Sequence, residues 1–175
     1  MSKKITIGLN TKDINRAIRE IEKYKKDVQA KTKELEKRIV ELLEQEVVTN
    51  FNSAVVDDRL RGGTRPAVVK VSVASIYSAS FVIAQGEDAI FCEFGAGVYH
   101  NGGAGSSPHP YGSQLGFTIG SYGQGKGKQQ SWGYYDTNGN LVITRGTPAT
   151  MPMYNALQTI LPRILEIAKE VFNSW

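Results

Sequence analysis

Three groups of residues in this 175-residue chain are of types that could do chemistry. The first is Gly120–Gly127, which matches the first seven positions of a phosphate-binding loop, G-x-x-x-x-G-K. The eighth position of that motif is a Ser or Thr that binds magnesium, whereas this chain has Gly127 there. The motif must also open a helix, and residues 128–132 lead instead into an aromatic strand. We therefore expect a glycine-rich loop, with no nucleotide site and no bound cofactor.

The second group is a lone cysteine with two histidines downstream. Cys92 with His100 or His109 could form a nucleophile–base pair, and the three together could hold a metal ion. However, Cys92 lies between Phe91 and Phe94, in an apolar run where a lone cysteine is usually a small buried hydrophobe. The spacing matches no metal motif, so neither a catalytic nor a metal site is expected. A single cysteine also leaves no internal disulfide.

The third group is the adjacent pair Asp57 and Asp58, which could suggest paired catalytic carboxylates or a metal site. Adjacent aspartates at a helix end point in different directions, and no third ligand lies nearby in the sequence. Paired glycines and a proline complete the stretch Asp57–Pro66, which predicts a charged loop.

Charge and composition exclude some function classes. The chain has a net charge of +4, and residues 1–60 hold 13 of the 21 Lys and Arg and 11 of the 17 Asp and Glu. Mixed signs attract phosphate weakly, so specific nucleic-acid recognition is not indicated, although incidental contact with DNA is left open. No apolar run approaches the roughly 18–20 residues that a membrane span needs, so no membrane partner is expected.

Residues 10–56 are predicted to form a helical arm. Apolar residues recur at steps of three and four between positions 14 and 47, and no Gly or Pro interrupts residues 12–61. One helix of about 40 residues would be roughly 60 Å long, which is too long to bury on one small domain. Either the helix breaks near Lys25–Lys33, where the apolar stripe is most polar, or part of it packs against neighbouring subunits.

The rest of the chain predicts an α+β fold, with 1–175 as a single domain. Residues 66–146 are expected to form the sheet, with a glycine-rich loop inserted at 95–130 and an extended or short helical run at 89–94. Residues 150–175 predict an amphipathic helix packed on the sheet. An antiparallel sheet of about five strands is expected, from alternating or β-branched runs at 5–9, 67–74, 80–84, 132–135 and 141–144.

Two further features shape these elements. Asn138-Gly139 predicts a tight hairpin between the last two strands. Pro162 predicts a kink in the C-terminal helix, because proline removes a backbone donor.

The loop 95–130 is rich in glycine and low in charge. Eleven of the chain's eighteen glycines lie between Gly95 and Gly127, and Lys126 and Lys128 are the only charged residues from Gly95 to Tyr135. Its aromatic side chains stand among glycine, serine and glutamine, a composition that suits either a flexible surface loop or a segment that orders against a partner. We expect this loop to order only beside its neighbours.

The residues on either side of this loop resemble a protein family. The run 91–97, F-C-E-F-G-A-G, resembles the E-F-G-T-G box of a tail-component family of tailed bacteriophages, the neck or tail-completion proteins. That family continues with a variable loop, a Trp/Tyr strand, a small hairpin, a T-x-G-x-P-A-x-P-M segment and a terminal amphipathic helix. Residues 132–135, 138–139 and 144–154 match in the same order, and the likeness covers about half of the chain. The residues that carry it are Glu93, Phe94, Gly95, Gly97, Trp132, Tyr134, Gly146, Pro148, Met151 and Tyr154.

Two positions depart from the family pattern. Ala96 stands where the box usually has Thr, and Leu60–Thr64 stands where the family often has T-G-x-L-x-x-S. Glu93, flanked by Phe91 and Phe94, is interpreted as a structural carboxylate, held by backbone N–H groups or by an arginine such as Arg145.

The resemblance implies a structural virion protein rather than an enzyme. It would form a homo-oligomeric ring at the head–tail junction, as a neck or tail-completion component, after assembly in the host cytoplasm. Its partners would be other copies of itself and other connector and tail proteins, with incidental contact with DNA in the lumen. The alternatives are a tail terminator and an adhesion or receptor-binding module, with a small hydrolase or nucleotide-binding protein less favoured.

Overall fold

The structure is a computed structural model of the whole chain. It describes residues 8, 10–57, 64–77, 79–96, 107–117, 132–135, 138–144 and 146–173. These divide into two compact units. One unit contains residues 1–39 and 163–175, and the other contains residues 40–162.

Helix α1 (Thr11–Ser53) runs for 43 residues without interruption. Asn10 caps it, because the Asn10 side-chain oxygen accepts the backbone N–H of Asp13 at 2.8 Å. The break near Lys25–Lys33, one of the two alternatives from sequence, is absent. Although α1 is long, no helix in the described part of the chain is also apolar enough to cross a membrane.

The first unit pairs the beginning of α1 with α4 (Ile164–Asn173). Val171 of α4 is only 1% exposed, and the Lys31 ammonium donates to its carbonyl oxygen at 2.6 Å. A cation is favourable beside the carbonyl groups of the last turn of a helix. Arg38 lies 3.7 Å from Glu170 in the same unit.

The C-terminal helix is divided where proline predicted a kink. Helix α3 (Pro152–Ile160) is followed by a 3₁₀ turn, η3 (Leu161–Arg163), and then by α4. Pro162 lies inside that turn, where its missing N–H cannot support an α-helical hydrogen bond. The kink is confirmed, and it separates two helices rather than bending one.

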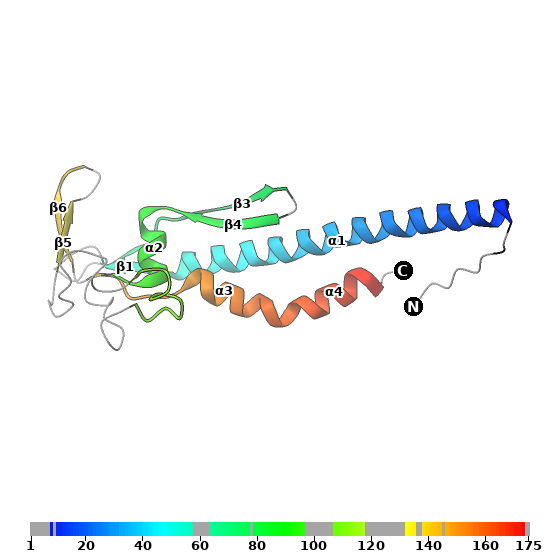
Figure 1. The fold of residues 1–175 in the computed structure, drawn as a ribbon. Coiled ribbons are helices and arrows are strands. Elements are labelled where there is room, and N and C mark those ends of the chain that lie inside the picture. The colour runs from blue at the N-terminus through cyan, green and yellow to red at the C-terminus, as the bar shows by residue number, and fades with distance from the viewer. Residues whose placement is uncertain are drawn as a thin grey trace. The chain divides into compact units, whose positions relative to one another are not determined.

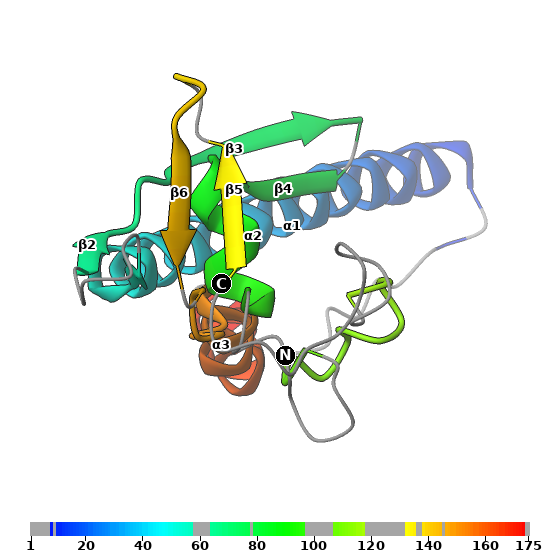
Figure 2. The same ribbon diagram turned by 90° about the vertical axis from the view of Figure 1, so that its left-hand side faces the viewer.

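The strands form three separate two-stranded antiparallel pairs (Figures 1 and 2). The prediction of one sheet of about five strands is wrong for the described strands. Alternation in the sequence indicates which side chains share a face, but not which strand edges meet. The expected strand at 5–9 lies outside the described residues. The pairs are β1 (Val55–Asp57) with β2 (Thr64–Pro66), β3 (Lys70–Ile76) with β4 (Ala79–Gln85), and β5 (Trp132–Tyr135) with β6 (Leu141–Thr144).

Strands β1 and β2 lie where a loop was expected over Asp57–Pro66. Their register pairs Val55 with Pro66 and Asp57 with Thr64. The expected loop is therefore strand at Asp57 and at residues 64–66, and residues 58–63 lie outside the described residues.

The core of the second unit is formed by residues of α1, β1, α2 and α3, with one face of a two-stranded hairpin packed against it. Helix α2 (Glu87–Phe94) packs against α3 and against β1, which corrects the expectation that the C-terminal helix covers a sheet. One face of the β3–β4 hairpin, including Val71 and Val82, packs against this core. Its buried residues are Val47, Phe51, Ala54, Val56, Ala89, Cys92 and Ala156.

The start of α2 is fixed by Gly86 and Asp88. Gly86 has φ +140°, and a Cβ there would lie 2.5 Å from the carbonyl oxygen of Val68. Asp88 is buried in the first turn, where its carboxylate accepts two hydrogen bonds from Arg65, at 2.5 and 2.8 Å, and one from the Val68 N–H at 2.8 Å. A carboxylate is favourable at a helix N-terminus, and this one also attaches β2 to α2.

Candidate functional site

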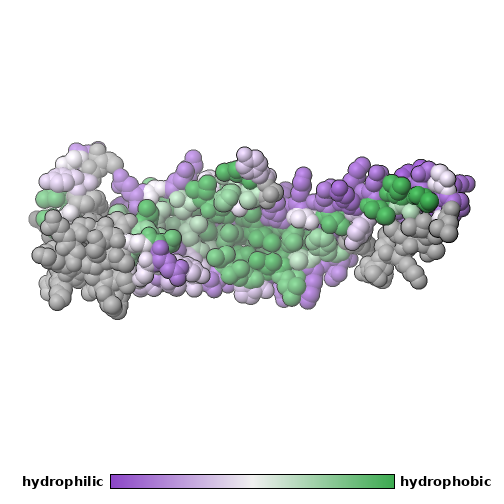
Figure 3. Space-filling model, viewed as in Figure 1, coloured by the Kyte–Doolittle hydropathy of each residue, from purple (hydrophilic) through white to green (hydrophobic). Residues whose placement is uncertain are grey.

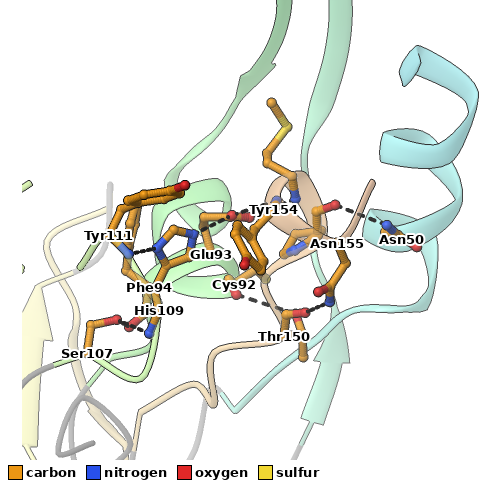
Figure 4. Close-up of polar contacts among 12 residues, drawn as sticks. Asn50, Cys92, Glu93, Phe94, Ser107, His109, Tyr111, Thr150, Tyr154 and Asn155 are labelled. Carbon is orange, nitrogen blue, oxygen red and sulfur yellow. Dashed lines mark hydrogen bonds and ion pairs between the residues drawn. The ribbon is translucent and has the colours of Figure 1, made fainter. Parts of the chain in front are cut away.

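Two of the segments singled out in the sequence, residues 92–96 and 147–154, meet in the folded chain. Ala96 and Thr147 exchange backbone hydrogen bonds of 2.8 and 3.1 Å. The backbone N–H groups of Thr150 and Met151 both donate to the carbonyl oxygen of Cys92, at 2.8 and 3.0 Å. The C-terminal end of α2 is therefore joined to the N-terminal end of α3, although Thr150 follows Cys92 by 58 residues. We call this contact the α2–α3 junction (Figure 4).

Glu93 is the side chain at the centre of the α2–α3 junction. Its two carboxylate oxygens accept the backbone N–H groups of Met153, at 2.8 Å, and of Tyr154, at 2.9 Å. These N–H groups belong to the first turn of α3, where a helix has no acceptors of its own. The residue before α3, Met151, makes no side-chain cap and has the left-handed φ of 54°. Glu93 therefore caps α3 from another helix.

The sequence offered two ways to hold this carboxylate, and backbone N–H groups are the one observed. Arg145, the alternative, lies outside the described residues. Glu93 is buried, so its charge needs hydrogen bonds and favourable dipoles to be tolerated. The two N–H groups and the positive end of α3 supply both.

His109 completes the hydrogen bonding of Glu93. Its Nε2 lies 3.1 Å from a Glu93 carboxylate oxygen, and its Nδ1 accepts the Tyr111 backbone N–H at 3.0 Å. A nitrogen that accepts cannot carry the proton, so Nε2 bears it and donates to Glu93. The rings of Phe94, Tyr111 and Tyr154 surround the imidazole, with centroids 4.6, 5.8 and 5.2 Å from its own.

Residues 107–117 fold back onto the α2–α3 junction as a series of turns. The Ser107 hydroxyl donates to the carbonyl oxygen of Phe94 at 2.5 Å, and Phe117 stacks on Phe94 with ring centroids 3.8 Å apart. The expectation that the loop 95–130 orders only beside its neighbours is therefore wrong for this segment. Aromatic and histidine side chains find partners on the chain's own α2. Residues 97–106 and 118–131 of that loop, with the run Gly120–Gly127, lie outside the described residues.

The remaining motif residues have separate structural roles. Gly95, with φ +78°, ends α2, and its N–H donates to the carbonyl oxygen of Phe91. Gly146 has φ +104° and leads into the pair with Ala96, whereas Pro148 is exposed. Gly97 and the side chains of Trp132 and Tyr134 lie outside the described residues.

Sequence reasoning missed the part that Ser107, His109 and Phe117 play in this site. These residues fall in a loop whose sequence has neither helical nor strand periodicity. The one feature that could have indicated a packed segment was a Ser-x-His sequence beside aromatic residues, in a stretch almost without charge.

Cys92 is fully buried in the core. Burial, with the carboxylate of Asp88 as the next cause, raises the pKa of its thiol to about 11. Both ring nitrogens of His109 are used by Glu93 and Tyr111, and His100 lies outside the described residues. Within the described ranges, no three His, Cys, Asp or Glu side chains are grouped to hold a metal ion. The chemistry visible at this site is mutual hydrogen bonding.

Comparison with known proteins gave no match to a family model, a curated protein or a solved structure. The function is therefore argued from the residues and their geometry.

We predict that Glu93→Gln lowers the free energy of unfolding by about 1–3 kcal/mol, measured by urea denaturation. The amide keeps one acceptor but loses the charge and turns a donor toward the N–H groups of α3. Glu87→Gln, an exposed position on the same helix, is the matched control and should change stability by less than about 0.5 kcal/mol. Equal stability of the Glu93 variant and the wild type would show that the carboxylate has no capping role.

We also predict that Cys92 makes the protein less stable as the pH rises from about 9 to about 11. In that range the unfolded thiol, with a pKa of 9.0, loses its proton while the folded thiol keeps it. The unfolded state then binds fewer protons, so the free energy of unfolding falls with increasing pH. Cys92→Ala should have a shallower slope over this range. Rapid alkylation of the native wild type at pH 8 would contradict the buried, protonated thiol.

Proposed function

We propose that this chain is a structural virion protein of a tailed phage, which assembles into a homo-oligomeric ring at the head–tail junction. In this proposal it is a neck or tail-completion component that acts without a cofactor, and its partners are its own copies and the adjoining connector and tail proteins. Support comes from the order of the family-like segments. It also comes from the way three of their residues, Glu93, Met151 and Tyr154, meet at one structural junction.

The observation that carries this proposal is the apolar outer face of the β3–β4 hairpin. The register places Ala74 opposite Phe81 and Ile76 opposite Ala79, on the face away from Val71 and Val82. Side chains on this outer face are strongly exposed, with 57% for Ile76 and 47% for Phe81. Figure 3 shows apolar side chains, in green, gathered over this hairpin.

The hairpin is also unusual in its charge and its tip. No charged residue occurs from position 71 to 86, so the charge on the outer face is confined to Lys70 at the start of β3, opposite Gln85. Tyr77 stands fully exposed at the tip with a left-handed φ of 57°, a conformation that costs a residue with a side chain about 1 kcal/mol or more. Two strands alone are marginally stable in water, and exposed apolar patches mark interaction sites. A surface of this kind suits a protein that works inside an assembly.

The first unit has a second exposed apolar surface. Ile14, Ile18 and Ile21 of α1 follow helical spacing and are 43%, 48% and 52% exposed. A subunit in a closed ring needs two different contact surfaces, one for each neighbour. The outer face of the β3–β4 hairpin and the start of α1 offer one such surface in each unit.

We predict that the purified full-length protein forms discrete oligomers of more than two copies, measured by light scattering and native mass spectrometry. Phe81→Lys should reduce the oligomeric fraction at least tenfold, because it places a charge in the apolar contact. Ile90→Lys on α2, where the native side chain is 48% exposed, is the control matched for exposure and should assemble like the wild type.

A protein that stays monomeric at every concentration would contradict the ring. Antibody labelling of phage particles separates the remaining alternatives. Labelling at the head–tail junction supports a neck, completion or terminator component, whereas labelling at a distal tail tip would indicate an adhesion module.

A further inference from the structure

The β3–β4 hairpin has two long strand edges. Among the described strands, none other than these two pairs with β3 or with β4 (Figure 2). The register runs one residue to one residue from Lys70 with Gln85 to Ile76 with Ala79, so no bulge interrupts it. A strand edge of this kind presents a row of backbone N–H and C=O groups that can pair with a strand of another chain.

The hairpin lacks the features that usually prevent such pairing, namely charge, proline, a bulge or short length. Residues 71–86 contain no charged residue and no proline, and β3 and β4 have 7 residues each. The other described pairs are different. Strands β1 and β2 have 3 residues each, with Arg65 and Pro66 in β2, and β5 and β6 have 4 residues each. Within the described part of the chain, a long and unprotected edge is therefore specific to β3–β4.

The register also determines which backbone groups point away from the hairpin. Two residues separate Ile76 from Ala79, so this pair closes the turn as a hydrogen-bonded pair. Hydrogen-bonded and non-hydrogen-bonded pairs alternate along an antiparallel ladder, so the N–H groups of Val71, Val73 and Ser75 point away from β4. These are the donors that a third strand beside β3 would use.

From this geometry we propose that β4 of one copy pairs antiparallel with β3 of the next copy, so that the hairpins of neighbouring subunits form one continuous antiparallel sheet. The inference rests on the proposed ring and specifies a contact between its subunits. Because each copy uses its β4 edge toward one neighbour and its β3 edge toward the other, the contact repeats from copy to copy and suits a closed ring.

Charge at the ends of the strands favours a second copy as the occupant of this edge. Antiparallel pairing of β4 with β3 places Lys70 of one copy near Glu87, which directly follows β4 in the other. Both side chains are exposed, and their charges are opposite. Antiparallel pairing of β3 with β3 would instead place Lys70 beside the apolar end of the neighbouring strand at Ile76. The β4–β3 arrangement also keeps the apolar outer faces of neighbouring hairpins on one side of the sheet.

The test is amide hydrogen exchange in the assembled full-length protein, read by NMR after the exchange is quenched and the assembly is dissolved. The monomeric fraction of Phe81→Lys is the reference. We expect the Val73 and Ser75 amides to exchange at least about tenfold more slowly in the assembly than in this monomer, because strand pairing gives their N–H groups acceptors. The Ala74 amide bonds within the hairpin, so its rate should change much less.

A pair of variants at Val73 tests the same contact. Val73→Pro removes one outward N–H group and leaves the ladder between β3 and β4 complete, so it should reduce the oligomeric fraction in native mass spectrometry at least about tenfold. Val73→Ala also loses the valine side chain but keeps the N–H group, and it should assemble like the wild type. Should Val73→Pro fail to fold, the exchange rates of the wild-type assembly decide.

Two outcomes separate this contact from the ring itself. Oligomers in which Val73 and Ser75 exchange as fast as in the monomer, or a folded Val73→Pro that assembles like the wild type, would overturn the strand pairing and leave the ring standing. A protein that is monomeric at every concentration would overturn both.

Discussion

The second unit depends on one electrostatic constraint, the need of a buried helix start for hydrogen-bond acceptors. Helix α3 begins at Pro152 after a residue that provides no side-chain cap, so its first N–H groups need acceptors from elsewhere. Glu93 supplies them from α2, and the Cys92 carbonyl supplies one for the residues just before α3. Because the same carboxylate also binds His109, one buried charge fixes two helices and the segment 107–117 relative to each other.

That constraint gives a physical reason for the order of the sequence motifs. An E-F-G run ends one helix with its glutamate facing inward, and a P-A-x-M-P run begins the next helix with its N–H groups exposed to that glutamate. Each run is incomplete alone, because a buried carboxylate without donors and a helix start without acceptors are both costly. The apolar surfaces on β3–β4 and on the start of α1 lie apart from these residues in the sequence. The α2–α3 junction and the exposed apolar surfaces are therefore formed by different parts of the chain.

The sequence predicted elements better than their arrangement. Steps of three and four located α1, and Pro162 located the division between α3 and α4, because these signals act within a few residues. The prediction of one sheet was wrong for the described strands, since β-branched alternation at 70–76 does not specify which strand is its neighbour. Each described pair joins two strands that follow one another in the chain. From its apolar flanks Glu93 was expected to be held by backbone N–H groups or by an arginine, and its carboxylate accepts the N–H groups of Met153 and Tyr154. The role of His109 depends on a contact 16 residues away in a loop without periodicity, so no local pattern indicated it.

The cap of α3 by Glu93 is tested most directly by the amide exchange rates of Met153 and Tyr154 in the native protein. The first N–H groups of a helix ordinarily exchange quickly, because they have no acceptor within the helix. If Glu93 caps them, both amides should exchange only on global unfolding, as slowly as the core amides of Val47 and Ala89. Exchange of these two amides at the rate of an exposed loop, while Val47 stays protected, would contradict the cap and the arrangement built on it.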